Sequence, residues 1–316
     1  MMTQTLFAGH RLSLGSSTLP ALRTLALAAL LLPLLGGAAQ AGTRTVDERR
    51  DAAPAGTVEI EGVSGSFTIT GWEKAEVQIQ GKLDERIELD FTREGDHTII
   101  EFRFPKRSGL NWGGDECDLT IRVPEGSDLT TRVVSADLTA ALVKGEVDLE
   151  TVSGQVEVRD APRRVRAKSV SGSVRILAET MNVVAESVSG SVLLRGSGGQ
   201  AELASVSGDV EVQAGSFTDL EVSSVSGNVR FAGRFSDHAR GELSSHSGTV
   251  EVIVPVDTSA DFSVETFSGS IQSDFGGEVE RTSQYVPGKE LEFSLGSGSG
   301  RIEVSSFSGS VRLIKK

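Results

Sequence analysis

The sequence predicts an all-β fold, a single-chain β-solenoid similar to a parallel β-helix, with two strands in each coil of about 18 residues. A Ser-Gly pair recurs at a fixed interval in the centre of the chain, and apolar residues recur at fixed offsets from it, mostly two residues apart. The low aromatic content of 5%, with 36 Gly and only 8 Pro, suits a core of small side chains.

The repeat is defined by its first serine, which we number position 1. Five central copies begin at Ser135, Ser153, Ser171, Ser189 and Ser207, 18 residues apart. Apolar residues occupy positions 4, 6, 13, 15 and 18, and we expect all of them to be packed. A helix would need spacings of three and four, so each copy is predicted to form two short strands. Gly at position 2 suits a turn that needs positive φ or a close approach of the backbone.

Copies with a constant phase can bury one face by stacking as parallel strands about 4.8 Å apart. Charges at outward positions alternate in sign along this stack, as in Glu150, Lys168 and Glu186 at position 16. In-register stacking favours such alternation, although chance placement on a solvated face is an alternative. Position 17 lies an even number of residues from positions 13 and 15, so its side chain should point to the same, inner face. This predicts an internal ladder of hydroxyl groups with a structural role, formed by Thr151, Ser169, Ser187 and Ser205.

The alternative fold is an antiparallel β-sandwich or meander in which each Ser-Gly pair forms a hairpin turn. It gives no reason for near-identical units of constant phase, so the solenoid is favoured. The general bias of parallel crossovers favours right-handed coils. The sheet edge at each end of such a stack would allow end-to-end self-association.

Residues 1–41 are predicted to be a signal peptide cut after Ala41. They contain no acidic residue, an apolar run at 25–35 and the small-residue motif Ala39-Gln40-Ala41. A membrane-spanning helix needs about 20 apolar residues, so we expect no stable membrane insertion after cleavage. The expected location is the periplasm, the cell surface or the medium.

The remaining chain divides into three parts. Residues 42–56 are predicted to be a polar lead-in, 57–134 the first coil with degenerate N-terminal coils, and 135–316 the regular solenoid. Strand alternation persists between residues 70 and 129 without the repeat, which indicates either degenerate coils, the favoured interpretation, or a small antiparallel cap. The final strand is followed by Lys315 and Lys316, which we expect to blunt the last sheet edge.

Later copies are longer, and the extra length lies between positions 6 and 13. Insertions at one point of a repeat emerge on one edge of a solenoid, here from segments 213–218, 232–240, 254–260 and 273–300. This edge is the predicted binding surface, although tolerated loop drift is an alternative. Its candidate residues are Arg234, Phe235, His238, Arg240 and Tyr285.

No catalytic, cofactor or metal site is predicted. His97, His238 and His246 are isolated, and His246 stands at position 18, where we expect it to be packed. The single cysteine, Cys117, is expected to be packed, with a pKa raised by its acidic neighbours. The net charge of −13 disfavours binding to nucleic acid.

Several features together resemble the bacterial putative-adhesin β-strand-repeat family. They are the predicted signal peptide, Gly71-Trp72-Glu73 after the first coil, Val123-Pro124 before the regular repeats, and the run of Val-Ser-Gly-x-Val copies. The resemblance covers about residues 45–316. It implies an exported envelope protein with a β-solenoid fold, and it supplies no catalytic residues.

The sequence therefore predicts a non-enzymatic exported cell-envelope protein, an adhesin-like scaffold that recognises an envelope component, glycan or surface ligand. One alternative is a structural or envelope-stress-linked periplasmic protein. Another is a polysaccharide-active β-helix enzyme, for which Asp257 and Asp261 would be the carboxylates to test. A third, an ice-binding protein, needs a repeated Thr-x-Thr array, and Thr68-Ile69-Thr70 occurs once.

Overall fold

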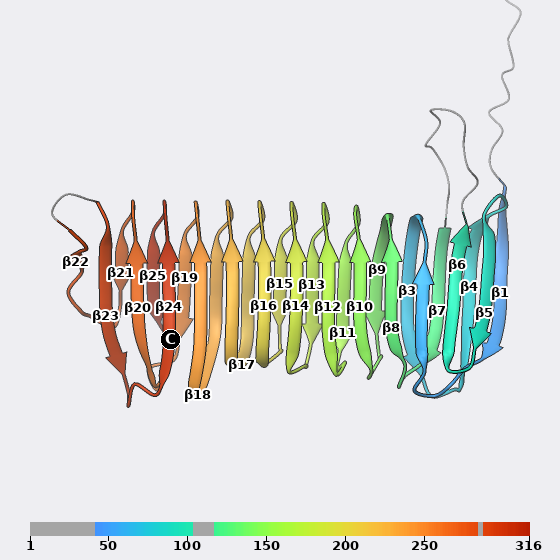
Figure 1. The fold of residues 1–316 in the computed structure, drawn as a ribbon, viewed down its shortest axis with the longest axis horizontal. Coiled ribbons are helices and arrows are strands. Elements are labelled where there is room, and N and C mark those ends of the chain that lie inside the picture. The colour runs from blue at the N-terminus through green and yellow to red at the C-terminus, as the bar shows by residue number, and fades with distance from the viewer. Residues whose placement is uncertain (1–41, 104–116, 284–286) are drawn as a thin grey trace, which may run out of the picture. The chain divides into compact units, whose positions relative to one another are not determined.

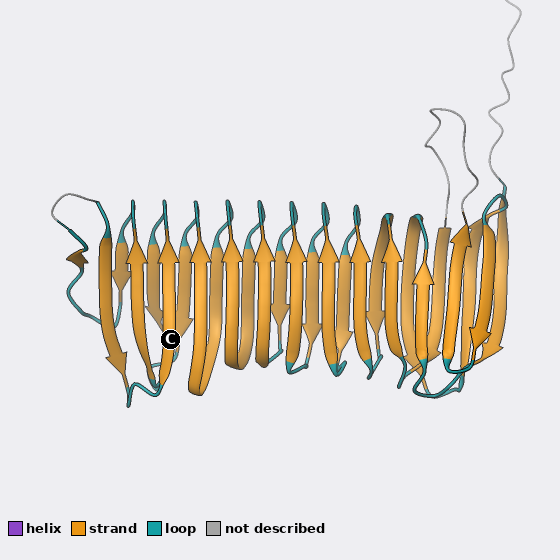
Figure 2. Ribbon diagram, in the orientation of Figure 1, coloured by secondary structure: helices purple, strands orange, loops and turns teal. Residues whose placement is uncertain are grey.

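Pairs of short strands, joined by turns, stack coil upon coil through the computed structural model (Figures 1 and 2). It describes residues 42–103, 117–283 and 287–316, and within these ranges there are strands but no helix. Neighbouring coils in the centre pair parallel and in register, so the predicted β-solenoid is confirmed. The predicted signal peptide lies outside the described residues.

The strands form two facing rows that are joined through the long strands β17 and β18. The first row contains, in spatial order, β5 (Glu88–Glu94), β6 (His97–Arg103), β2 (Thr57–Glu61), β8 (Asp128–Val133), β10 (Glu146–Thr151), β12 (Arg164–Ser169), β14 (Asn182–Ser187), β16 (Gly199–Ser205), the second halves of β17 (Val210–Ser224) and β18 (Val229–Ser245), β24 (Gly300–Ser306), β20 (Ala260–Thr266), β23 (Lys289–Leu295) and β22 (Glu280–Arg281). The second row contains β1 (Thr43–Asp51), β4 (Glu76–Asp84), β7 (Cys117–Pro124), β3 (Ser64–Trp72), β9 (Ser135–Ala141), β11 (Val156–Asp160), β13 (Val174–Ala178), β15 (Val192–Arg195), the first halves of β17 and β18, β19 (Val250–Val254), β25 (Val311–Lys315) and β21 (Ile271–Ser273).

The coil is right-handed. In Figure 1 the chain rises through β12 at the front, crosses the upper turn, and descends through β13 at the back while it advances to the left. This is the hand that parallel crossovers prefer.

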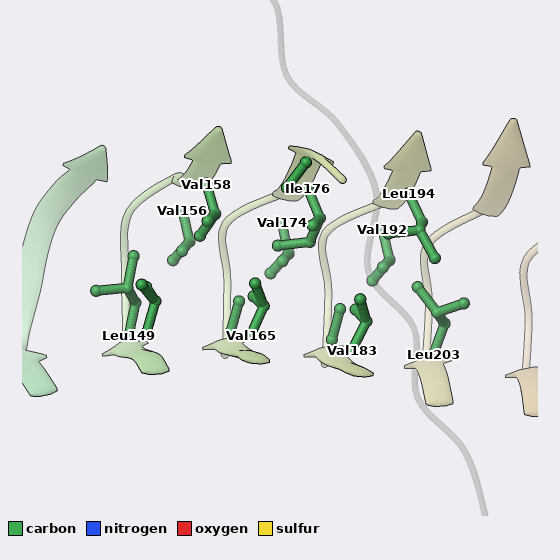
Figure 3. Close-up of a cluster of buried hydrophobic side chains, with 14 of the residues drawn as sticks. Leu149, Val156, Val158, Val165, Val174, Ile176, Val183, Val192, Leu194 and Leu203 are labelled. Atoms are coloured by element: carbon green, nitrogen blue, oxygen red, sulfur yellow. The ribbon is translucent and has the colours of Figure 1, made fainter. Parts of the chain in front are cut away.

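Small aliphatic side chains from both rows fill the space between them (Figure 3). Val156 stands opposite Val174 in register, and Val174 opposite Val192. All three are at most 1% exposed, as are Val165 and Leu149 in the facing row. Burial of each such side chain contributes about 1.5–3 kcal/mol, so identical coils add similar increments.

The turn that follows the first row is held by the side chain at position 17. Ser187 Oγ donates to the carbonyl of Gly172 in the preceding coil at 2.9 Å and accepts from the N–H of Gly190 in its own coil at 2.9 Å. Ser169, Ser205 and Ser224 repeat both bonds. The predicted hydroxyl ladder is therefore present, and it joins successive turns.

Glycine at position 2 is required by close approach rather than by positive φ. A Cβ on Gly190 would lie 2.1 Å from the carbonyl oxygen of Gly172, and φ at Gly190 is outside the left-handed region. Gly208 and Gly227 meet the glycine of the coil before them in the same way, at 2.1 and 2.0 Å. Each turn glycine therefore lets the next turn stack directly on it.

The N-terminal end departs from the prediction. The expected polar lead-in contains strand β1, which pairs antiparallel with β4 along its whole length. Strands β2 and β3, the first predicted coil, stack directly on β8 and β9. Strands β4 to β7 lie on their other side, where β4 and β5 run antiparallel to β7 and β6. This end is thus a mixed cap rather than a series of degenerate coils.

The C-terminal end is also out of sequence order. Strands β24 and β25 insert between the coil that ends at β19 and the coil formed by β20 and β21. Lys315 therefore belongs to an interior strand, and the expectation that Lys315 and Lys316 blunt the last edge is wrong. Strand β23 instead covers β20 with antiparallel pairing.

Removal of one position-17 hydroxyl should measure the strength of the turn ladder. Ser187→Ala leaves the Gly172 carbonyl and the Gly190 N–H unpartnered, and we expect a loss of about 2 kcal/mol in the free energy of unfolding, measured in urea. Ser187→Thr should retain most of the stability, because Thr266 makes the equivalent bond at 2.9 Å. Ser189→Ala is the control, since Ser189 is exposed. Equal stability of the Ser187→Ala and Ser189→Ala variants would contradict this role.

Candidate functional site

The predicted insertions largely meet at the lower edge in Figure 1, which we call the inserted edge and define by residues 213–218, 232–240, 254–260 and 296–300. Two of these segments are not loops, because they lie inside β17 and β18, which bend continuously through the edge. The long excursion 273–300 is only partly on this edge, since β23 runs along the end of the stack.

The predicted site residues have different environments. Arg234 is exposed and forms an ion pair with Asp257 at 3.2 Å. His238 is exposed, has a φ of 59°, and places Nδ1 3.3 Å from the carbonyl of Ser299. Arg240 is exposed beside Arg301 of β24. Phe235 packs on the core and stacks on Phe231 at 4.7 Å, so it is largely structural.

Tyr285, the fifth predicted residue, lies outside the described residues. The other four come from one bend of β18 and share the inserted edge.

Serine hydroxyls that the prediction missed form a cluster at the same edge. Ser259 Oγ is 2.7 Å from Ser297 Oγ and 3.2 Å from Ser299 Oγ. Nearby, Ser216 and Ser236 hydroxyls are 3.0 Å apart between β17 and β18. Glycines at positive φ, Gly296 and Gly298, shape the turn that carries Ser297 and Ser299. The edge therefore combines exposed guanidinium groups with hydroxyl groups from separate segments.

The opposite edge carries an exposed apolar ridge, which corrects the expectation that position 18 is packed. Position 18 has the parity of the outward positions 14 and 16, so its side chains point to solvent and the valines are 43–47% exposed. Backbone bonds of the turn ladder, such as Ser171 N–H to Val152 O at 2.8 Å, place successive members on adjacent coils. The ridge consists, in spatial order, of Val134, Val152, Val170, Val188, Val206, Val225, His246, Phe307 and Phe267.

The ridge ends in stacked aromatic rings. His246 lies 4.8 Å from Phe307 at an interplanar angle of 4°, and Phe307 lies 4.9 Å from Phe267 at 5°. Phe307 and Phe267 remain 49% and 44% exposed. His246 is thus a member of an exposed stack rather than a packed side chain. Figure 2 shows the turns of this edge as a regular row along the top of the coils.

A shallow hollow of about 620 Å³ runs beside the valine half of the ridge. Its lining alternates between ridge valines and the outward residues of position 16, among them Arg132, Glu150, Lys168 and Glu186. The last two form an ion pair at 2.9 Å, and Arg132 lies 3.7 Å from Glu150. The predicted alternation of charge at this position therefore holds.

Position 14 shows the opposite pattern in the later coils. Glu202, Glu221, Glu242 and Glu303 stand side by side in register. Burial, together with the charges of Glu202, Glu242 and Asp219, raises the pKa of Glu221. Like charges directly opposite each other in a sheet are destabilising, so repulsion between these glutamates lowers the stability of the stack.

The two carboxylates that an enzyme of the β-helix type would need, Asp257 and Asp261, have separate partners. Asp257 pairs with Arg234, whereas Asp261 accepts from Ser294 Oγ at 2.6 Å, so each carboxylate has its own partner. Cys117 is buried, and burial followed by the charge of Asp118 raises its pKa to about 12. In the described ranges no group of three or more His, Cys, Asp or Glu side chains is placed to hold a metal ion.

Residues 42–103, 117–283 and 287–316 include no helix that is long and apolar enough to cross a bilayer.

A family model named Toastrack DUF4097 matches residues 53–313. The chain belongs to the Toastrack DUF4097 family. The match begins after β1 and covers the coils and the remaining strands of both ends. No curated protein matches the sequence.

Several solved structures are similar to this Toastrack chain. A putative adhesin from Bacteroides fragilis NCTC 9343 has 11% identity and a TM-score of 0.38, with 87% of this chain and 99% of that chain covered. A putative cell adhesion protein from Clostridium sporogenes ATCC 15579 has 12% identity and a TM-score of 0.25, with 86% and 100% covered. A putative lipid binding protein from Parabacteroides distasonis ATCC 8503 has 15% identity and a TM-score of 0.29, with 85% and 96% covered. The family match, rather than these low scores, carries the assignment.

The glutamate column should make stability depend on pH. The pKa of Glu221 is raised above its ordinary value of 4.5 in the folded chain. The stability that protonated Glu221 contributes is therefore fully present below about pH 4.5, and it is lost as the pH rises through the raised pKa. We expect Glu221→Gln to unfold at a higher temperature than the parent near pH 7, with the difference shrinking towards about pH 4. The control is Glu186→Gln, which loses an ion pair with Lys168 and should bring no gain near neutral pH. A constant difference between Glu221→Gln and the parent across this range would contradict the account.

Proposed function

We propose that this Toastrack chain is an exported, non-enzymatic cell-envelope scaffold whose inserted edge recognises a glycan or another hydroxyl-rich surface component. The observation that carries the proposal is the concentration of chain-length variation at one edge of an otherwise uniform stack. The opposite turns keep a constant length, so variation in the inserted segments leaves the core untouched.

The chemistry of the inserted edge supports a polar, oxygen-rich ligand. Arg234 and Arg240 are exposed guanidinium groups on one bend of β18. Ser259, Ser297 and Ser299 supply hydroxyl groups that both donate and accept. Guanidinium groups bind carboxylates and sugar hydroxyls through paired N–H donors, and charged donors make the stronger hydrogen bonds. Such a set suits an acidic or neutral saccharide.

Export rests on the sequence of residues 1–41, which has the charge distribution and small-residue motif of a signal peptide. We expect protein recovered outside the cytoplasm to begin at Gly42, as determined by N-terminal sequencing. Recovery of the intact chain from the cytoplasm alone would contradict export.

Recognition can be tested on a glycan array with the full chain. We expect the parent to bind a subset of saccharides, and Arg234→Ala with Arg240→Ala to weaken that binding at least about tenfold, because two charged donors are lost. The matched control is Arg175→Ala with Arg312→Ala, which removes the same charge from exposed positions in the second row. Binding that survives in the first double variant, or falls equally in both, would place recognition elsewhere.

A further inference from the structure

The two halves of the apolar ridge complement each other in size. Towards the N-terminal end its members are valines, and their neighbours at position 16 are long and charged: Arg132, Glu150, Lys168 and Glu186. Towards the C-terminal end its members are Val225, His246, Phe307 and Phe267, and the neighbours at position 16 are mostly small. These are Ser223, Ser244 and Ser305, followed by Glu265 at the last coil. Val206, beside Ala204, is the middle member.

When a second copy of the ridge is placed opposite the first in reverse order, with the two Val206 side chains facing each other, large side chains lie opposite small ones. Phe267 then faces Val134, Phe307 faces Val152, and His246 faces Val170. In the neighbouring column Glu150, Lys168 and Glu186 each face a serine, so no two like charges meet. At the ends, Arg132 faces Glu265, which is exposed and stands in register with another acid, Glu290.

We propose that two copies of this chain dock ridge to ridge, antiparallel, about a two-fold axis that passes beside Val206. A two-fold axis that lies in the contact plane, perpendicular to the stack, makes each column face itself in reverse order. This inference concerns the edge opposite the inserted edge and does not depend on the proposed function.

The spacing of the ridge favours a second copy over other partners. Its members recur about every 4.8 Å, the distance between paired strands, whereas the side chains on one face of an extended peptide recur about every 6.6 Å. A second copy has the same spacing and keeps its register along the whole ridge. The hollow of about 620 Å³ beside Val152, Val170 and Val188 lies where the partner copy would place its aromatic stack.

The contact area predicts a weak dimer. Nine ridge members span about 38 Å, and two packed sheets stand about 10 Å apart, so the turns alone offer roughly 400 Å² from each copy. A standard stable interface takes about 800 Å² from each partner. We therefore expect a concentration-dependent equilibrium rather than an obligate dimer.

A cysteine on the proposed axis gives a direct test with the full chain. Val206→Cys should form a disulfide-linked dimer under mild oxidation, because residue 206 meets its own copy at the axis. Val152→Cys is the matched control, since Val152 is equally exposed but its two copies would stand about 29 Å apart. The natural Cys117 is buried. Cross-linking of Val206→Cys at least about tenfold faster than that of Val152→Cys is the expected result, and equal rates would overturn the proposal.

Sedimentation equilibrium of variants tests the same arrangement without cross-linking. Arg132→Glu or Glu265→Arg alone should weaken dimerisation, since each places like charges opposite each other, and the double exchange should restore it. Phe307→Asp should also weaken it, whereas Met181→Asp, at an exposed apolar residue outside the ridge, should not. A parent that stays monomeric at the highest soluble concentration, or a double exchange that fails to restore association, would overturn the proposal.

Discussion

The central coils depend on a hydrogen-bonded bridge at the Ser-Gly turn, with both bonds formed by Ser169, Ser187, Ser205 and Ser224. A buried hydroxyl at position 17 satisfies a carbonyl of one coil and an N–H of the next, so two backbone groups that the turn would otherwise leave unpaired acquire partners. The missing side chain of glycine lets the next turn approach within this bonding distance. Together they keep the coils in register where the strands themselves stop. The last carbonyl of the series, on Gly269, accepts from Lys289 Nζ at 2.7 Å, so the bridge is closed at its end as well.

Much of the fold could be predicted because the coils repeat a physical requirement. Alternation, phase and charge sign all reflect in-register stacking, and the parity of Ser187 and its equivalents identified the hydroxyl ladder. The ends could not be predicted, because coils 260–273 and 300–315 carry nearly the same side chains at buried positions, and either could stack on β18 and β19. The antiparallel strand β23 distinguishes them, since Phe293 stacks on Phe262 at 5.0 Å.

The candidate surfaces were only partly predictable for a related reason. The position of the extra residues in each repeat correctly predicts that Arg234, His238 and Arg240 share one edge. Residue type alone does not predict that Phe235 is packed rather than exposed. Apolar character alone does not predict the ridge, because it suits a buried position equally well. Its parity held the needed signal: if position 17 points inward, the adjacent Val170 or Val188 must point outward. The serines of the inserted edge lie in turns of simple composition. Their proximity depends on the insertion of β24 and β25 ahead of β20 and β21, which the sequence does not predict.

The two caps have a consequence for how such a scaffold changes over evolutionary time. Strands β4 to β7 close the stack at one end and strands β20 to β23 at the other, and the uniform coils lie between them. Gain or loss of one central repeat would therefore leave both closures intact and alter only the separation between them, by about 4.8 Å. The length of the solenoid can therefore change by single coils while both ends stay the same. Each added coil would move the midpoint of the uniform edge by half the spacing between coils.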